Sequence, residues 1–166
     1  VLFGHDPRRH SWTMVYKSIR MAQANGAKLI VMDPRRSENA EAADIWLPLR
    51  AGTDGAMAFG WLNVIIDEEL YDKDFVRDWT HGFEEFAERV REFPLDRVAE
   101  ITGVDAELIA EAARLYATTK PASIPWSPIT DQQISSTSAI RLQCILRALT
   151  GNLDVAGGDT FVGFNP

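Results

Sequence analysis

The stretch that decides the fold runs from Lys28 to Asp54 and reads KLIVMDPRRSENAEAADIWLPLRAGTD. A strand is predicted at Lys28–Met32, because its residues after the lysine are apolar without polar alternation, as in a parallel sheet covered on both faces. A second strand is expected at Ile45–Leu49, with about one helical turn at Glu38–Ala43 between the two. The strands end in Asp-Pro-Arg-Arg and Arg-Ala-Gly-Thr-Asp. Such groups can bind the phosphates, ribose and base of a nucleotide.

The rest of the chain alternates short apolar strands with amphipathic helices, which predicts an α/β fold. Further strands are expected at Val1–Phe3 and Pro121–Trp126. Helices are expected from Ser11 as N-cap, after Asp54, and over residues 72–80, 82–93, 102–118 and 136–149. We therefore predict a Rossmann-like parallel sheet with flanking helices and right-handed crossovers. A helical excursion is predicted at about residues 70–118, within a single domain that spans residues 1–166.

Composition and charge exclude several classes of partner. The formal net charge of -7 argues against nucleic acid, whose phosphates are held by clustered Lys and Arg. No apolar run approaches the roughly 18 residues of a membrane span, so no direct membrane contact is expected. Cys144 is the only cysteine, which excludes an intrachain disulfide and favours a small buried hydrophobe within its helix. A reducing compartment fits, so the cytoplasm is favoured and the periplasm is the alternative.

Polar segments follow the predicted strands, at the edge where open parallel sheets bind ligands. The first is Gly4–Pro7, in which the glycine permits a sharp turn or a close ligand approach, although G-x-G-x-x-G is missing. Asp33 stands where Rossmann-type domains place the acid that binds a ribose hydroxyl, and Pro34 fixes the turn. Arg35 or Arg36 can offer a planar fork to a phosphate or stack on a base. A plain turn and a solvated ion pair are the alternatives for these segments.

The third segment is Arg50 to Asp54. Gly52 and Thr53 supply a tight turn with free N–H groups at a helix start, which favours an anion. Asp54 either caps that helix or accepts two N–H donors of a guanine, because only a carboxylate supplies two acceptors in that geometry. A fourth segment, 127–133, is expected at the same edge.

The chain resembles the molybdopterin-dependent oxidoreductases of the dimethyl sulfoxide reductase and formate dehydrogenase superfamily. The matching segments are GHDP (4–7), DPRR (33–36), AD-x-W-L-x-L-R-x-G-T-D (43–54), TGVDAELIAEAARLYA (102–117) and LTGN…GG (149–158). The resemblance implies that this domain holds the guanine dinucleotide arm of a molybdopterin guanine dinucleotide that carries molybdenum or tungsten. The residues that it places on this arm are Gly4, Asp6, Asp33, Arg35, Gly52 and Asp54, and it places Thr130, Asp131 and Gln132 near the same cofactor. From the same segments, His5, Pro34, Arg50 and Thr53 are also predicted to bind the cofactor. The resemblance implies no catalytic residue and no metal ligand in this chain.

The same resemblance implies a fragment of a longer enzyme. The family's iron–sulfur domain needs clustered cysteines, so a 4Fe-4S cluster is expected only in the parent protein, outside this chain. The isolated chain is expected to be inactive, with the rest of the parent chain and electron-transfer subunits as partners.

Family members usually carry asparagine where this chain has Asp6. GHDP and WSPITDQQ (126–133) are more similar to the branch that includes tungsten-dependent acetylene hydratase, which performs hydration without net redox chemistry. A nicotinamide dehydrogenase domain and a binding or chaperone module with a degenerate site are the remaining hypotheses.

Overall fold

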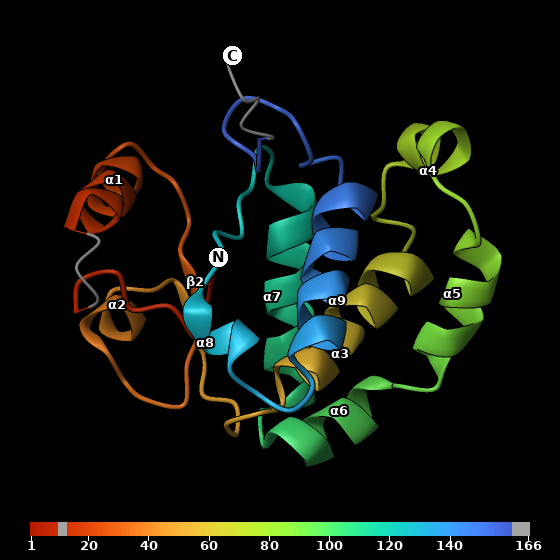
Figure 1. Cartoon of the computed structure of the whole chain (residues 1–166), viewed down its shortest axis with the longest axis horizontal. Helices are drawn as coiled ribbons and strands as arrows, with labels where there is room; N and C mark the ends of the chain where they lie inside the picture. Colours follow the sequence, from red (N-terminus) through yellow and green to blue (C-terminus); the bar gives the residue numbers. More distant parts are fainter. Residues whose placement is uncertain (10–12, 161–166) are drawn as a thin grey trace.

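A parallel sheet lies at the centre of residues 1–9 and 13–160, the part of the chain that the computed structural model describes (Figure 1). Strand β1 (Leu2–Phe3) pairs with β2 (Ile30–Met32), and β2 pairs with β3 (Ile45–Leu47). The helices are α1 (Thr13–Ala24), α2 (Glu38–Glu41), α3 (Asp54–Asp67), α4 (Lys73–Trp79), α5 (Phe83–Arg91), α6 (Leu95–Thr102), α7 (Ala106–Thr118), α8 (Pro128–Asp131) and α9 (Ser136–Leu149). The predicted α/β class, a parallel sheet with flanking helices, is confirmed.

Helices cover both faces of the sheet, because successive strand side chains point to opposite sides. Phe3, Met32 and Leu47 belong to the main core with α3, α7 and α9. Leu2 and Val31 belong to a smaller cluster that α1 and α2 cover. Figure 1 shows these two groups of helices on either side of the strands. The unbroken apolar runs of the sequence thus reflect burial on both faces.

Helix α3 is the hub of the main core and contacts α5, α6, α7 and α9. Its Trp61 is fully buried and packs against Tyr116 of α7, with ring centroids 5.4 Å apart. Gly60 lets α6 approach closely, since an added Cβ would lie 2.8 Å from Val98 Cγ1. Helices α4 to α7 occupy the excursion predicted at about residues 70–118, but no strand follows them within the described residues, so the excursion does not lie between two strands.

The helix predicted at 102–118 begins later in the structure. Thr102 ends α6, and Gly103 adopts the left-handed conformation that stops α6. Asp105 then caps α7 by accepting from the amides of Glu107 and Leu108. The predicted cap at Ser11 lies outside the described residues.

The predicted strand at Pro121–Trp126 is wrong, since this segment has no regular structure. Its backbone amides bond to side chains instead of a neighbouring strand. Ala122 N donates to Asn152 Oδ1 at 2.8 Å, and Ile124 N donates to Asp159 Oδ2 at 3.0 Å. The two prolines supply no N–H at all. Side-chain acceptors therefore take the place of a neighbouring strand in this segment.

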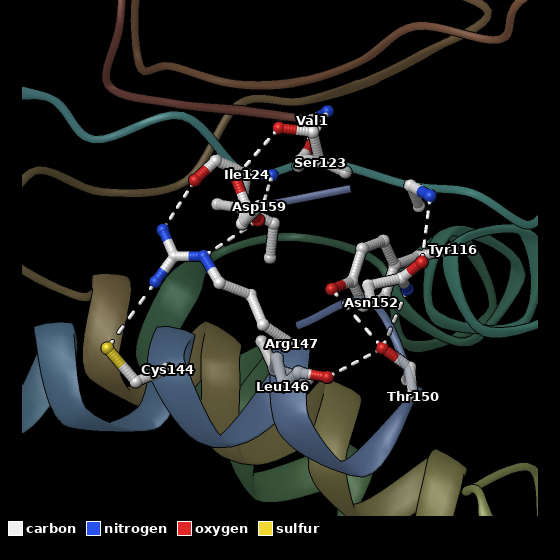
Figure 2. A network of polar contacts seen from close by, with 11 residues as sticks. Val1, Tyr116, Ser123, Ile124, Cys144, Leu146, Arg147, Thr150, Asn152 and Asp159 are labelled. Carbon is white, nitrogen blue, oxygen red and sulfur yellow. Dashed lines mark hydrogen bonds and ion pairs between the residues drawn. The ribbon is translucent and has the colours of Figure 1, made fainter. Parts of the chain in front are cut away.

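An ion pair joins α9 to this irregular segment (Figure 2). Arg147 Nε donates to Asp159 Oδ2 at 2.9 Å, and Nη2 donates to the Ile124 carbonyl. The side chains of Arg147 and Asp159 are only 12% and 21% exposed. Arg147 Nη1 also reaches Cys144 Sγ at 3.4 Å. Cys144 is exposed, so its expected burial is wrong: it lies beside the Leu142–Leu146 stripe and not within it.

We expect Asp159→Ala to lower the free energy of unfolding by about 3 kcal/mol, because it removes the carboxylate partner of a mostly buried guanidinium and the acceptor of the Ile124 amide and the Ser123 hydroxyl. Urea denaturation at pH 7 measures this loss. Glu68→Ala is the matched control, since it breaks a bidentate but exposed pair with Arg114 and should cost at most about 1 kcal/mol. Equal losses in the two variants would contradict the prediction.

Candidate functional site

The carboxyl ends of β1, β2 and β3 bring the predicted segments to one edge of the sheet. Gly4 follows β1, Asp33 follows β2, and Arg50 to Asp54 come shortly after β3. Helix α8 joins this edge, because Ser127 Oγ donates to the Gly4 carbonyl at 3.1 Å. The four segments that were identified separately in the sequence thus lie at the same side of the sheet.

Gly4 makes the predicted sharp turn after β1. Its φ is +53°, and its amide donates to the Met32 carbonyl at 2.8 Å, so the ladder continues one residue beyond the strand. An added Cβ would come within 3.1 Å of Ile129 Cγ2. The close neighbour is therefore α8. His5, next in the chain, is buried.

Asp6 is a buried carboxylate whose two oxygens both accept hydrogen bonds. Its Oδ2 accepts from Arg35 Nη2 at 3.0 Å, and its Oδ1 accepts from Asn39 Nδ2 at 3.0 Å. The side chain is 4% exposed, while that of Arg35 is 57% exposed. Asp6 thus links the loop after β1 to the residues after β2. Asn39 was not predicted as a site residue. A polar residue in a short helix gives no sequence signal of its own, and its partner Asp6 lies 33 residues away in the chain.

The turn after β2 sends its two arginines in different directions. Asp33 Oδ1 accepts from the Arg35 amide at 2.8 Å, which closes an Asx turn around the exposed Pro34. The Arg36 guanidinium lies over the Trp46 ring, 5.9 Å from its centroid. Arg35 therefore faces Asp6 and the loop after β1, while Arg36 lies over β3.

Arg50 caps the C-terminus of α6. Its Nη1 donates to the carbonyls of Glu100 and Ile101, at 2.6 and 3.1 Å. Its amide donates to the Thr102 carbonyl at 2.8 Å. Gly103 makes room for the guanidinium, since an added Cβ would lie 3.2 Å from Arg50 Cζ. The positive charge of Arg50 thus stabilises the carbonyl groups at the C-terminus of α6, which is a structural role.

Gly52 and Thr53 form the expected tight turn before α3. Gly52 has a φ of +83°, and Thr53 Oγ1 donates to the Arg50 carbonyl at 2.6 Å. Thr53 occupies the N-cap position, and Asp54 is the first residue of the helix. The interpretation of Asp54 as the N-cap is therefore not supported.

The environment of Asp54 opposes its negative charge. The residue is 7% exposed, and burial raises the pKa of its carboxyl above the usual 3.8. The Gln133 amide lowers this pKa in part, and the negative charge of Asp33 raises it further. Asp33, Asp54 and Gln133 are thus close enough to act on one another. Burial therefore outweighs the hydrogen bonds that Gln133 and the Asp54 amide supply, so the charged form of Asp54 is poorly stabilised.

Other polar atoms near this edge also lack partners. Thr130 Oγ1 is buried and makes no hydrogen bond within the described residues, and the same holds for Asn39 Oδ1. Buried polar groups without partners are uncommon, and a bound polar ligand is one explanation. Asp131 and Gln132 are exposed, and Asp131 accepts from Trp126 Nε1 at 3.0 Å. The donor and acceptor set fits a nucleotide ligand.

A cavity with a volume of about 770 Å³ lies elsewhere. Its lining comes from α1, from the residues that lead into β1 and β2, and from the loop after α7. It therefore opens at the amino ends of the strands, away from the polar edge. Within the part of the chain that the structure describes, no cluster of three His, Cys, Asp or Glu residues could hold a metal ion. The described helices include none that could span a lipid bilayer.

Comparison with known proteins gives consistent matches. The sequence model of the family described as Molybdopterin oxidoreductase matches residues 1–162. Acetylene hydratase of Syntrophotalea acetylenica is 56% identical over 152 residues, which are 92% of this chain and 21% of that protein. Formate dehydrogenase H of Escherichia coli K12 is 40% identical over 165 residues, which are 99% of this chain and 22% of that protein.

A solved structure agrees with these sequence matches. The structure of acetylene hydratase from Pelobacter acetylenicus matches with a TM-score of 0.86 at 56% identity. The match covers 90% of this chain and 21% of that one. The chain thus spans about a fifth of the length of the relatives that it matches.

We expect Asp54→Asn to stabilise the unliganded protein at pH 7, because it removes a buried charge. The pKa of Asp54 is higher in the folded state than in the unfolded state, so its cost is present above the folded pKa. The advantage of the variant should shrink as the pH falls through that pKa toward 3.8, the usual value. Chemical denaturation at a series of pH values measures it.

Asp44→Asn is the control with the opposite sign. The hydrogen bond from Lys28 and that from the Leu29 amide lower the pKa of Asp44. This group therefore stabilises the fold above its unfolded pKa and loses that effect as the pH falls through its folded pKa. An Asp54→Asn variant that is less stable than the parent at pH 7, as Asp44→Asn should be, would contradict the prediction.

Proposed function

The chain belongs to the molybdopterin oxidoreductase family, and on that premise we propose that its polar sheet edge binds the guanine dinucleotide arm of a molybdopterin cofactor. The observation that carries the proposal is Asp54. It is a buried carboxylate with a raised pKa, next to Gln133. The N1–H and N2–H groups of a guanine would supply two further donors to its charged form.

Other residues of the edge fit the rest of the nucleotide. Asp33 lies close enough to Asp54 to raise its pKa, at the strand end where a ribose is bound in related α/β domains. Arg35 is more than half exposed and offers planar donors to phosphates. Gly52 exposes the turn before α3, and the unpartnered Thr130 Oγ1 adds a further polar contact. Arg50 supports this edge indirectly, because its guanidinium bonds to a carbonyl of α6.

The role of the chain in this proposal is to anchor the cofactor. When bound, the cofactor supplies a molybdenum or tungsten centre for the reaction. The residues of this chain bind and orient the nucleotide end, and they take no part in bond making. The rest of the parent chain completes the site, and electron-transfer subunits are the partners we propose for an oxidoreductase.

The proposal is tested on the full-length protein purified with its cofactor. We expect it to contain molybdenum or tungsten by elemental analysis and to release guanosine monophosphate on mild acid hydrolysis. Asp54→Ala should lower both contents in parallel, because it removes the guanine contact. Full-length protein that contains pterin and metal but releases no guanine nucleotide would contradict the guanine assignment. Protein without metal or pterin would overturn the cofactor proposal as a whole.

A second candidate concerns the reaction of the parent enzyme. Identity is 56% to acetylene hydratase and 40% to formate dehydrogenase H, and the segments GHDP and WSPITDQQ resemble the acetylene hydratase branch. These features favour hydration of a small alkyne, without net redox change, over oxidation of formate. We expect the cofactor-loaded full-length protein to form aldehyde from acetylene in the absence of an electron acceptor. Formate-dependent dye reduction without aldehyde formation would favour the oxidoreductase instead.

A further inference from the structure

Asp6 is an acidic residue at the edge that is proposed to bind the phosphates of the cofactor. A carboxylate only accepts hydrogen bonds, and it repels another anion. In this structure the Asp6 side chain is 4% exposed, and its two oxygens are taken by Arg35 and Asn39. Asp6 is therefore badly suited to contact a phosphate itself, which argues for an indirect role.

We propose that Asp6 and Asn39 are positioning residues that hold the Arg35 guanidinium in place for the phosphates of the cofactor arm. This inference rests on the proposed function and deepens it. Arg35 is held at both ends, since its amide donates to Asp33 Oδ1 at 2.8 Å and its Nη2 donates to Asp6 at 3.0 Å. The bond to Asp6 uses only part of the five N–H donors of a guanidinium. The remaining donors belong to a side chain that is 57% exposed.

The energetic reason is preorganisation. A free arginine side chain samples many rotamers, and this freedom is lost when the side chain is fixed on a ligand. A support that fixes the guanidinium beforehand removes part of that cost from binding. Asn39 is fully buried and Asp6 nearly so, which makes the support rigid. Arg9 Nε lies 4.0 Å from Asp6 Oδ2 and adds a second, more distant cation.

The same geometry predicts which replacement keeps the support. In Asp6→Asn the side-chain oxygen can still accept from Arg35. The new amide would then face Asn39, whose Oδ1 has no partner within the described residues. A rotation of the Asn39 amide would turn that oxygen toward the new donor and restore the second bond. Asp6→Ala offers neither bond.

The test measures how much the phosphates add to binding. Full-length protein that is purified without cofactor is titrated with guanosine and with guanosine diphosphate, and the ratio of the two Kd values is the phosphate increment. Arg35→Met should lower this ratio about tenfold, the loss of one charge-assisted hydrogen bond. Asp6→Ala should lower it about fivefold and Asn39→Ala by less, while the Kd for guanosine stays unchanged.

A double-mutant cycle separates positioning from direct contact. Asp6→Ala together with Arg35→Met should lower the ratio no further than Arg35→Met alone, because Asp6 acts through Arg35. Asp6→Asn should stay near the parent value. Arg36→Met is the matched arginine control, since Arg36 lies over Trp46. Asp44→Asn is the carboxylate control, since Asp44 joins Lys28 and Leu29 before β2.

Each result has one meaning. Additive losses in the double variant, or equal losses of guanosine and guanosine diphosphate affinity in Asp6→Ala, overturn the positioning role. A phosphate increment that falls in Arg35→Met but stays intact in both Asp6→Ala and Asn39→Ala overturns it as well. Parent protein that binds neither guanosine nor guanosine diphosphate overturns the proposed function itself. Asn39→Ala keeps the test open if Asp6→Ala fails to fold.

Discussion

The parallel pairing of β1, β2 and β3 is the constraint on which the candidate site depends. Leu2 lies opposite Val31, and Val31 lies opposite Trp46, so the strands run in one direction with their carboxyl ends at one edge. The apolar strand residues are buried on both faces of the sheet. Turns that are far apart in the chain must therefore meet at the edge, and each of them carries polar side chains.

Carboxylates at this edge have different environments and hence different roles. Asp6 is neutralised by Arg35 and bonded by Asn39, so its charge is used within the protein. Asp54 is buried and its pKa is raised, so the protein stabilises its charged form poorly. Asp33 closes its own turn and adds negative charge near Asp54. A ligand with N–H donors would relieve this charge, whereas the fold alone does not. In the proposed complex, the cost would fall on stability and the gain on binding, as is common at functional sites.

Side-chain acceptors also determine the conformation of the segment 121–126, which is not a strand. The segment 121–126 lies where another strand was expected, yet Asn152 and Asp159 take its backbone amides. Arg147 then pairs with Asp159 and ties α9 to the same segment. This network stabilises the end of the domain without a ladder of strand hydrogen bonds.

Most of the local structure follows from the sequence alone, except at 121–126, where side chains of distant residues replace strand pairing. Apolar runs, the Asp-Pro and Gly-Thr turns and the spacing of α3 and α9 predicted the elements and the residues at the strand ends, because these signals depend on neighbours along the chain. Only the tertiary structure decided how the side chains pair. The bond of Arg35 to Asp6, the turn of Arg50 toward α6 and the exposure of Cys144 join or separate residues that are distant in sequence. Such pairings depend on the packing of whole elements, and no local pattern encodes them.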